Sequence, residues 1–185
     1  MRVSGGIYRS RSLESPKGMS VRPTANMVKE ALMNMLSGRL RGARVLDLFS
    51  GSGQMGIECL SRGASECVFA DISRESCALT SQNLKKLGIT ATIMQSDWRS
   101  TLTSLKARGI SFDIIIADPP YQAGLYEDIQ QCVLDGLLSE GGVLVLEHDK
   151  ASPPKVEQGY EVLKERAYGR RCLMILSATS DEFAV

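Results

Sequence analysis

The chain has 185 residues, a length typical of one domain, and 43% of them are hydrophobic, which is enough for a sizeable buried core. No apolar run approaches the length of a membrane-spanning helix, about 20 residues, and the first residues, MRVSGGIYRSRS, have no apolar signal core. The formal net charge is +1. These features favour a cytoplasmic protein and argue against a membrane protein.

The charge is unevenly distributed along the chain. Residues 1–44 carry nine Lys and Arg residues and two acidic ones, whereas acidic residues are in excess over the rest of the chain. A basic arm on an acidic body suggests a polyanionic partner, although the same charge also fits a solvated tail.

The cysteines and the histidine limit the metal chemistry that we expect. The five cysteines are odd in number, are never spaced as C-x-x-C, and are accompanied by a single histidine, His148. That composition predicts buried thiols in a reducing compartment and no metal site.

The first third of the chain predicts a broken segment followed by a helix. Gly5, Gly6 and Pro16 interrupt residues 1–18, which read as strand fragments and turns. Apolar residues then recur at helical spacing from Val28 to Leu36, which predicts an amphipathic helix.

From residue 44 onward, short apolar runs alternate with helical patterns. The predicted strands are 44–49, 66–71, 91–97, 112–118 and 142–149. One predicted helix follows the first strand and ends near residue 62, and three others span 74–87, 101–108 and 125–138. Residues 161–178 are typical of two strands joined by a turn at 168–170. This alternation predicts an α/β, Rossmann-like fold: a mostly parallel seven-stranded sheet, covered on both faces, with an antiparallel hairpin at its edge.

The stretch DLFSGSGQMG joins the first strand to the helix that follows it. Gly51 and Gly53 allow unusual backbone torsions and the close approach of a ligand, and the helix N-terminus favours an anionic group. Asp71 ends the next strand, where a carboxylate can accept hydrogen bonds from ribose hydroxyls. Together with Gly56, the two glycines also match G-x-G-x-x-G, so the loop alone leaves NAD, S-adenosylmethionine and a structural turn open.

Two further acids favour S-adenosylmethionine. Asp47, inside the first strand, can reach the ammonium group of a methionine moiety or orient the loop. Asp97 closes the third strand and can accept a hydrogen bond from an adenine amino group, or it can simply be the acid at a helix N-terminus. An acidic rim at the carboxyl ends of parallel strands suits a cationic sulfonium better than a dinucleotide. The following residues, Ile72 and Trp98, are further candidates for cofactor binding.

The motif DPPY follows the most apolar strand. The Asp118 carboxylate and the Pro119 carbonyl can accept hydrogen bonds from the two N–H groups of an exocyclic amino group. This orients the nitrogen lone pair toward a methyl donor. Pro119 and Pro120 make the turn rigid, and the Tyr121 ring can stack on a base. A base within a duplex must be unpaired or flipped to reach such a site. A Pro-Pro turn with no catalytic role is the alternative interpretation.

The segments RVSGGIYRSRSL, RPTANMVKEALMNML, LDLFSGSGQMGIECLSRGA and DPPY occur in this order. The chain thereby resembles the RsmD family of 16S ribosomal RNA guanine-N2 methyltransferases, which have the class I S-adenosylmethionine-dependent methyltransferase fold. The resemblance implies a target guanine of 16S rRNA in the 30S subunit or its assembly intermediate. It also implies a catalytic site at DPPY and cofactor contacts at Asp47, Phe49, Gly51, Gly53, Asp71 and Asp97.

The basic arm then gains a role as an RNA-docking segment. We expect residues 1–40 to form this extension and residues 41–185 to form the methyltransferase domain of a monomer. The candidates for RNA contacts are Arg9, Arg11, Lys17, Arg22 and Thr24.

Three other functions remain open from the residues alone. A DNA adenine-N6 methyltransferase would use the same DPPY chemistry. An NAD-dependent oxidoreductase would use the glycine loop, and a non-catalytic RNA-binding protein of ribosome assembly would keep the fold.

Overall fold

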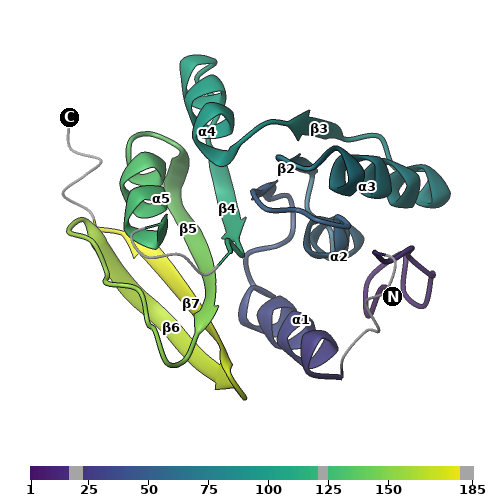
Figure 1. The fold of residues 1–185 in the computed structure, drawn as a ribbon, viewed down its shortest axis with the longest axis horizontal. Helices are drawn as coiled ribbons and strands as arrows, with labels where there is room; N and C mark the ends of the chain where they lie inside the picture. Colours follow the sequence, from purple (N-terminus) through teal and green to yellow (C-terminus); the bar gives the residue numbers. More distant parts are fainter. Residues whose placement is uncertain (17–22, 121–124, 180–185) are drawn as a thin grey trace.

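The computed structural model describes residues 1–16, 23–120 and 125–179, with the backbone alone for residues 23–25 (Figure 1). Its helices are α1 (Pro23–Met35), α2 (Gln54–Ser61), α3 (Arg74–Leu87), α4 (Trp98–Ala107) and α5 (Leu125–Leu134). Its strands are β1 (Arg44–Asp47), β2 (Glu66–Asp71), β3 (Thr92–Gln95), β4 (Phe112–Ala117), β5 (Leu138–Asp149), β6 (Tyr160–Tyr168) and β7 (Arg171–Ala178). Within the described part of the chain, no helix is both long and apolar enough to span a bilayer.

The seven strands form one sheet in the order β3-β2-β1-β4-β5-β7-β6. Strands β1 to β5 run parallel to one another, and β7 lies antiparallel between β5 and β6. The predicted seven-stranded, mostly parallel sheet with an antiparallel edge hairpin is therefore confirmed. Because the chain order reverses between β1 and β4, the carboxyl ends of these two strands border the crevice where open α/β sheets bind ligands.

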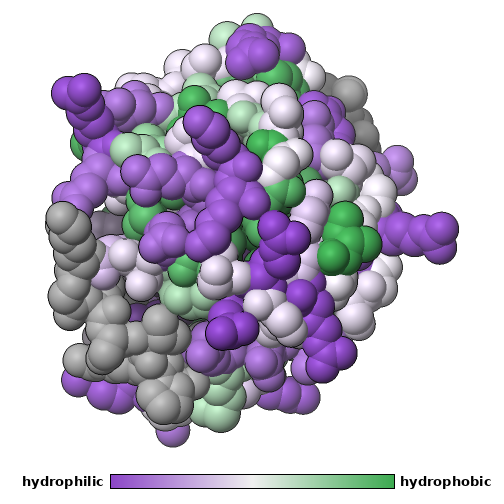
Figure 2. All heavy atoms as spheres, turned by 90° about the vertical axis from the view of Figure 1, so that its right-hand side faces the viewer, coloured by the Kyte–Doolittle hydropathy of each residue, from purple (hydrophilic) through white to green (hydrophobic). Residues whose placement is uncertain are grey.

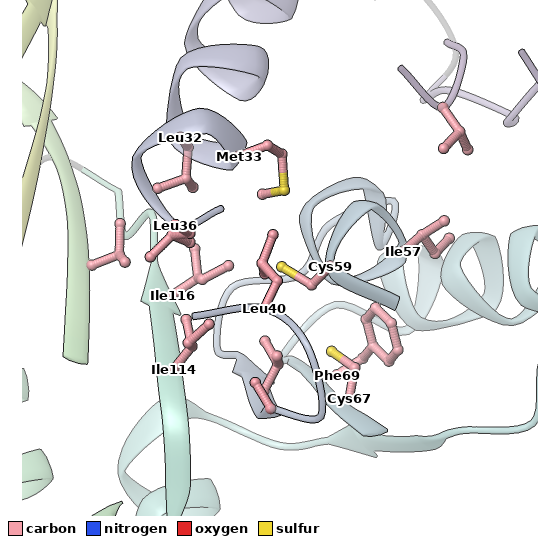
Figure 3. Packing of buried hydrophobic residues seen from close by; sticks show 14 of the residues in the cluster. Leu32, Met33, Leu36, Leu40, Ile57, Cys59, Cys67, Phe69, Ile114 and Ile116 are labelled. Carbon is pink, nitrogen blue, oxygen red and sulfur yellow. The ribbon is translucent and has the colours of Figure 1, made fainter. Parts of the chain in front are cut away.

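The apolar strands bury both of their faces. Val45 and Leu46 are consecutive residues of β1, yet they belong to different clusters of buried side chains. One cluster lies under α1, α2 and α3 and contains Ile114 and Ile116, whereas the other lies under α4 and α5. In the first cluster, Leu36, the residue after α1, lies beside Ile116 of β4, and Leu32 of α1 lies farther along the helix (Figure 3). This packing places α1 over the carboxyl half of β4.

Three predicted boundaries are wrong by three or four residues, for identifiable reasons. The fifth helix ends at Leu134, not at 138, because Gly136 takes a left-handed backbone conformation and Leu138 pairs with Phe112 of β4. Strand β5 thus begins at Leu138, four residues earlier than predicted, and Gly141 and Gly142 lie within it. The fourth helix begins at Trp98, three residues earlier than predicted, because Asp97 caps it.

The N-terminal segment packs on the α/β body (Figure 1). Arg2 and Ser12 form a β-bridge that brings the two ends of this segment together, and Val3 and Leu13 are buried in the cluster under α1 and α2. The backbone N–H of Ile7 donates to the Ser61 carbonyl of α2 at 2.8 Å. The division into a 1–40 extension and a 41–185 domain remains a prediction.

A replacement at Gly56 tests how tightly α2 packs on β2. A Cβ atom at this position would lie 2.3 Å from Cε1 of Phe69 and 2.6 Å from Sγ of Cys67. We therefore expect Gly56→Ala to lower the free energy of unfolding by about 1–3 kcal/mol. That loss corresponds to a fall in Tm of about 2–4 °C per kcal/mol, measured by circular dichroism. Gly38→Ala, where no atom lies within 4 Å, is the control, and an equal Tm for both variants would contradict the packing argument.

Candidate active site

A cavity of about 210 Å³ opens at the carboxyl edge of the sheet. Helix α1, the loop between β1 and α2, and the ends of β4, β5 and β7 enclose it. Its charged lining residues are Lys29, Asp47, Asp118, Glu147 and Arg171. The cavity therefore joins the glycine loop to the first residue of DPPY, as the sequence predicted.

The glycine loop is held by Asp71. Gly51 and Gly53 have φ angles of +54° and +75°, in the left-handed region that favours glycine. The N–H of Gly51 donates to Oδ2 of Asp71 at 2.9 Å, and the N–H of Ser73 donates to Oδ1 at 2.8 Å. Asp71 thus fixes the path of the loop across the top of β1 and β2. Its predicted contact with a ribose remains a prediction.

Asp47 orients the first turn of α2. Its side chain is buried, and Oδ2 accepts a hydrogen bond from the N–H of Gly56 at 2.9 Å. Burial raises the pKa of Asp47 to about 7; the Gly56 hydrogen bond opposes this shift, and the charge of Asp71 adds to it. Of the two predicted roles, this geometry provides the orientation of the loop and helix, and the contact with a methionine ammonium group remains a prediction.

Three further residues predicted to bind the cofactor, Ile72, Asp97 and Trp98, follow the ends of β2 and β3 and lie outside the lining of this cavity as the described residues define it. Oδ1 of Asp97 accepts from the N–H groups of Arg99 and Ser100 at 3.0 and 3.1 Å, so Asp97 is the N-cap of α4, the alternative that the sequence left open. The Arg99 guanidinium lies over the Trp98 ring, 4.4 Å from its centroid. Ile72 is 72% exposed, which is unusual for an isoleucine and leaves an apolar surface beside Asp71.

Asp118 directly follows β4 and faces the cavity. Its Oδ2 lies 3.9 Å from Nη1 of Arg171. Burial raises the pKa of Asp118 to about 7, the charge of Glu147 raises it further, and Arg171 opposes the shift. The side chain is 45% exposed, so solvent screens part of these effects. Pro119 is buried and Pro120 is exposed, whereas Tyr121 lies outside the described residues.

Three charged residues of the cavity, Lys29, Glu147 and Arg171, were missed by the sequence analysis. Glu147, near the end of β5, is 4% exposed and accepts a hydrogen bond from Nη1 of Arg171, the first residue of β7. Burial raises the pKa of Glu147, and Arg171 opposes that shift too. The signal for Glu147 was present, because it is a carboxylate near the end of a parallel strand, like Asp71 and Asp118. Nothing in the sequence brings Arg171 to the same site.

His148 faces the other side of the sheet. Its Nδ1 lies 3.0 Å from the Asp149 carbonyl oxygen, and its Nε2 lies 3.4 Å from Oε1 of Glu165. Sγ of Cys172 lies within 4.8 Å of these ligand atoms, so the group could hold a metal ion in principle. The contact between His148 and Glu165 accounts for the same geometry without a metal. That the protein needs no metal remains a prediction.

The candidate RNA contacts are only partly described. Arg9 and Arg11 are exposed on the N-terminal segment, and Nη2 of Arg11 donates to the Lys86 carbonyl oxygen of α3 at 3.4 Å. Lys17, Arg22 and the side chain of Thr24 lie outside the described residues.

The fold and the site together define a class I methyltransferase, the class that the sequence predicted. A solved structure titled "Putative methyltransferase yhhF from Escherichia coli" superimposes with a TM-score of 0.85 at 26% identity and covers 97% of this chain and 98% of its own. The methyl donor of this class is S-adenosylmethionine, the cofactor that the sequence predicted.

The family is narrower than the class. The family model described as "Conserved hypothetical protein 95" matches residues 1–177, so the chain belongs to this family, the RsmD family of the predicted resemblance. The "Putative rRNA methyltransferase YlbH" of Bacillus subtilis is 35% identical over 173 residues, which are 91% of this chain and 94% of YlbH. The "Ribosomal RNA small subunit methyltransferase D" of Escherichia coli is 30% identical, with coverage of 92% and 86% respectively.

Proposed function

We propose that this protein transfers a methyl group from S-adenosylmethionine to the exocyclic N2 amino group of a guanine in 16S rRNA. The substrate is the 30S subunit or its assembly intermediate, and the enzyme acts as a cytoplasmic monomer. One observation carries the proposal: Asp118 and the glycine loop line the same cavity. The names of YlbH and of the small subunit methyltransferase D support rRNA as the substrate.

The residues at the carboxyl edge of the sheet fit S-adenosylmethionine. Among the described residues, Oγ of Ser50 and Nε2 of Gln54 are buried without a hydrogen-bond partner, and both residues line the cavity. A polar ligand in the cavity can satisfy these atoms, whose burial is otherwise costly. Asp47 and the loop would hold the methionine end, and Asp71, Ile72, Asp97 and Trp98 would hold the nucleoside end. When bound, the cofactor supplies an electrophilic methyl group on a sulfonium.

The chain's own residues prepare the amino group for attack. The Asp118 carboxylate and the Pro119 carbonyl accept hydrogen bonds from its two N–H groups. These hydrogen bonds direct the nitrogen lone pair toward the methyl carbon. A new N–C bond forms as the C–S bond breaks, the sulfur keeps the bonding electrons, and the extra proton on nitrogen leaves to water. The carboxylate stabilises the positive charge that develops on nitrogen.

The N-terminal segment provides a docking surface for RNA. Hydrophilic side chains cover much of the face that carries this segment and α3 (Figure 2). Arg2 and Arg9 line an open hollow of about 660 Å³ between the segment and α1, and Lys29 lines both this hollow and the cavity. An RNA strand bound along the segment would therefore lie next to the catalytic cavity.

Loss of the arginines tests this docking surface. We expect the double variant Arg9→Ala/Arg11→Ala to bind 30S subunits more weakly and to show a shallower dependence of log K on log salt, because fewer counterions are released per complex. Filter binding at several salt concentrations measures both quantities. Arg108→Ala, which removes an exposed arginine at the end of α4, is the control. An unchanged salt slope in the double variant would refute the role of the two arginines.

The direct test of function is methylation of a defined substrate. The protein is incubated with labelled S-adenosylmethionine and 30S subunits that lack the modification, and the modified nucleotide is mapped. A single N2-methylguanine in 16S rRNA is the expected product. In a parallel incubation with DNA, methylation of adenine would favour a DNA adenine-N6 methyltransferase. If no methyl group is transferred to 30S subunits or to DNA, a non-catalytic RNA-binding role is favoured.

A further inference from the structure

We propose that Glu147 and Arg171 form a positioning pair for Asp118, in which Glu147 anchors the Arg171 guanidinium beside the Asp118 carboxylate. The inference rests on the proposed methyltransferase function, and it assigns to that reaction two residues that lie outside the glycine loop and DPPY.

The geometry places one guanidinium between two carboxylates. Nη1 of Arg171 donates to Oε1 of Glu147 and lies 3.9 Å from Oδ2 of Asp118. The three residues come from β7, β5 and the end of β4, which are neighbours through β5 in the sheet. Glu147 is 4% exposed and the Arg171 side chain is 42% exposed, so a buried carboxylate fixes one end of a partly exposed guanidinium. Arg171 is thereby anchored beside Asp118 before any substrate binds.

The remaining charges around Asp118 make this anchor necessary. Asp47 of β1 and Glu147 of β5 are both acidic, and each makes a negative charge on Asp118 less favourable. Lys29 of α1 lines the same cavity, but its Nζ is 2.8 Å from Oε1 of Glu58 and points into a different ion pair. Among the described residues of the cavity, Arg171 is the cation next to Asp118.

The charge of Asp118 decides whether the site can bind its substrate productively. A carboxylate offers only acceptors to the two N–H bonds of an amino group, whereas a carboxylic acid presents a competing O–H donor. With the pKa of Asp118 near 7, small changes in its neighbours change the active fraction of the enzyme at neutral pH. Arg171 lowers this pKa and Glu147 raises it, so the two members of the pair act on Asp118 in opposite directions.

Four variants and one direct titration test this assignment. Asp118 is titrated in the free protein by NMR of ¹³Cγ-labelled aspartate, with its signal assigned by its loss in Asp118→Asn. Arg171→Gln should raise the pKa of Asp118 by about one unit. Glu147→Gln keeps an amide oxygen that accepts from Arg171 and removes only the negative charge, so it should lower the pKa of Asp118 by a similar amount. Arg171→Lys keeps the charge and should restore most of the normal value. Arg170→Gln removes the neighbouring arginine, which is 89% exposed and paired with Asp149, and should leave the pKa unchanged.

The pH dependence of kcat/KM for 30S subunits provides the second readout. Because the anionic form is active, kcat/KM should rise with pH through the pKa of Asp118, and this limb should move up in Arg171→Gln and down in Glu147→Gln. If the pair has a purely structural role, the pH at which kcat/KM rises should shift in the same direction in both variants or stay unchanged in both. Either result would overturn the proposal. If the enzyme transfers no methyl group at all, the NMR titration still tests the pair, so failure of the proposed function and failure of this inference are distinguishable.

Discussion

Asp118→Ala should reduce kcat for methyl transfer by about 10²–10³-fold while leaving the affinity for S-adenosylhomocysteine within about threefold. The large loss is expected because the Asp118 carboxylate lines the cavity directly after β4, next to the buried Pro119, where it can accept from the reacting amino group. Cofactor affinity should persist, because the glycine loop is held by Asp71 rather than by Asp118. Transfer of labelled methyl to 30S subunits and isothermal titration with S-adenosylhomocysteine measure the two quantities.

Asp118→Asn separates the charge of this residue from its size. The amide has nearly the same shape, but its NH₂ group points donors at the substrate amino group, so we expect a loss of kcat similar to that of Asp118→Ala. A variant that kept more than a tenth of the wild-type kcat would show that Asp118 does not bind the reacting nitrogen.

Asp118→Asn should make the fold more stable, although it lowers kcat. The pKa of Asp118 is raised in the folded protein, so the folded state binds a proton that the unfolded state has already lost between about pH 4 and 7. The wild type therefore loses stability as the pH rises through this window, and Asp118→Asn does not. Because the side chain is 45% exposed, screening limits the gain to about 1 kcal/mol, or about 2–4 °C in Tm at pH 8. A raised or equal Tm in this variant shows that its loss of activity is not a loss of fold.

The sequence predicted the sheet well because each strand carries its own signal. Ile114, Ile115 and Ile116 are apolar in succession, and a run of this kind is stable only in a strand that is covered on both faces. The hairpin of β6 and β7 was likewise predicted from a turn between two strand patterns. The boundaries of α5 and β5 were less predictable, because Leu137 and Leu138 fit a helix as well as a strand until their pairing with Phe112 is known.

The site was predictable where its residues end neighbouring strands of the parallel sheet. Asp47, Asp71 and Asp118 lie at or directly after the ends of β1, β2 and β4, so strand order alone brings them to one edge. Arg171 reaches this edge only because β7 runs antiparallel to β5, which places the start of β7 beside the end of β5. In the sequence, Arg171 is one of several charged residues in the hairpin. Only the register between β5 and β7 shows that Arg171 is the one that lies at the cavity.

A second arrangement that required the structure is the buried charge network beneath the N-terminal segment. Glu58 of α2 is fully buried, and its carboxylate accepts hydrogen bonds from the N–H of Ser4 at 2.7 Å and from Oγ of Ser4 at 3.2 Å. It also pairs with Nζ of Lys29 at 2.8 Å and with Arg62. Nζ of Lys29 donates in turn to the Arg2 carbonyl oxygen at 2.8 Å. One carboxylate thus joins the N-terminal segment, α1 and α2.

Glu58→Ala should therefore lower the free energy of unfolding by about 3–5 kcal/mol, because it leaves the buried ammonium of Lys29 without its counter-charge. Tm should fall by about 2–4 °C per kcal/mol, and the N-terminal segment should become sensitive to trypsin at Arg9 and Arg11. Glu66→Ala removes a carboxylate of the exposed pair with Arg44, whose side chains are 42–51% exposed, and should change stability by less than about 1 kcal/mol.

The pH dependence of the stability lost in Glu58→Ala shows whether the loss is electrostatic. Although burial alone would raise it, the pKa of Glu58 lies below its usual value, because Lys29, Ser4 and Arg62 together outweigh the cost of burial. A lowered pKa means that the charged network stabilises the fold above the pKa of the unfolded glutamate and that this contribution is lost as the pH falls through the folded value. The difference in Tm between wild type and Glu58→Ala should therefore be largest at neutral pH and should narrow below pH of about 4. A difference that stayed constant down to acidic pH would mean that Glu58 stabilises the N-terminal segment by packing and not by charge.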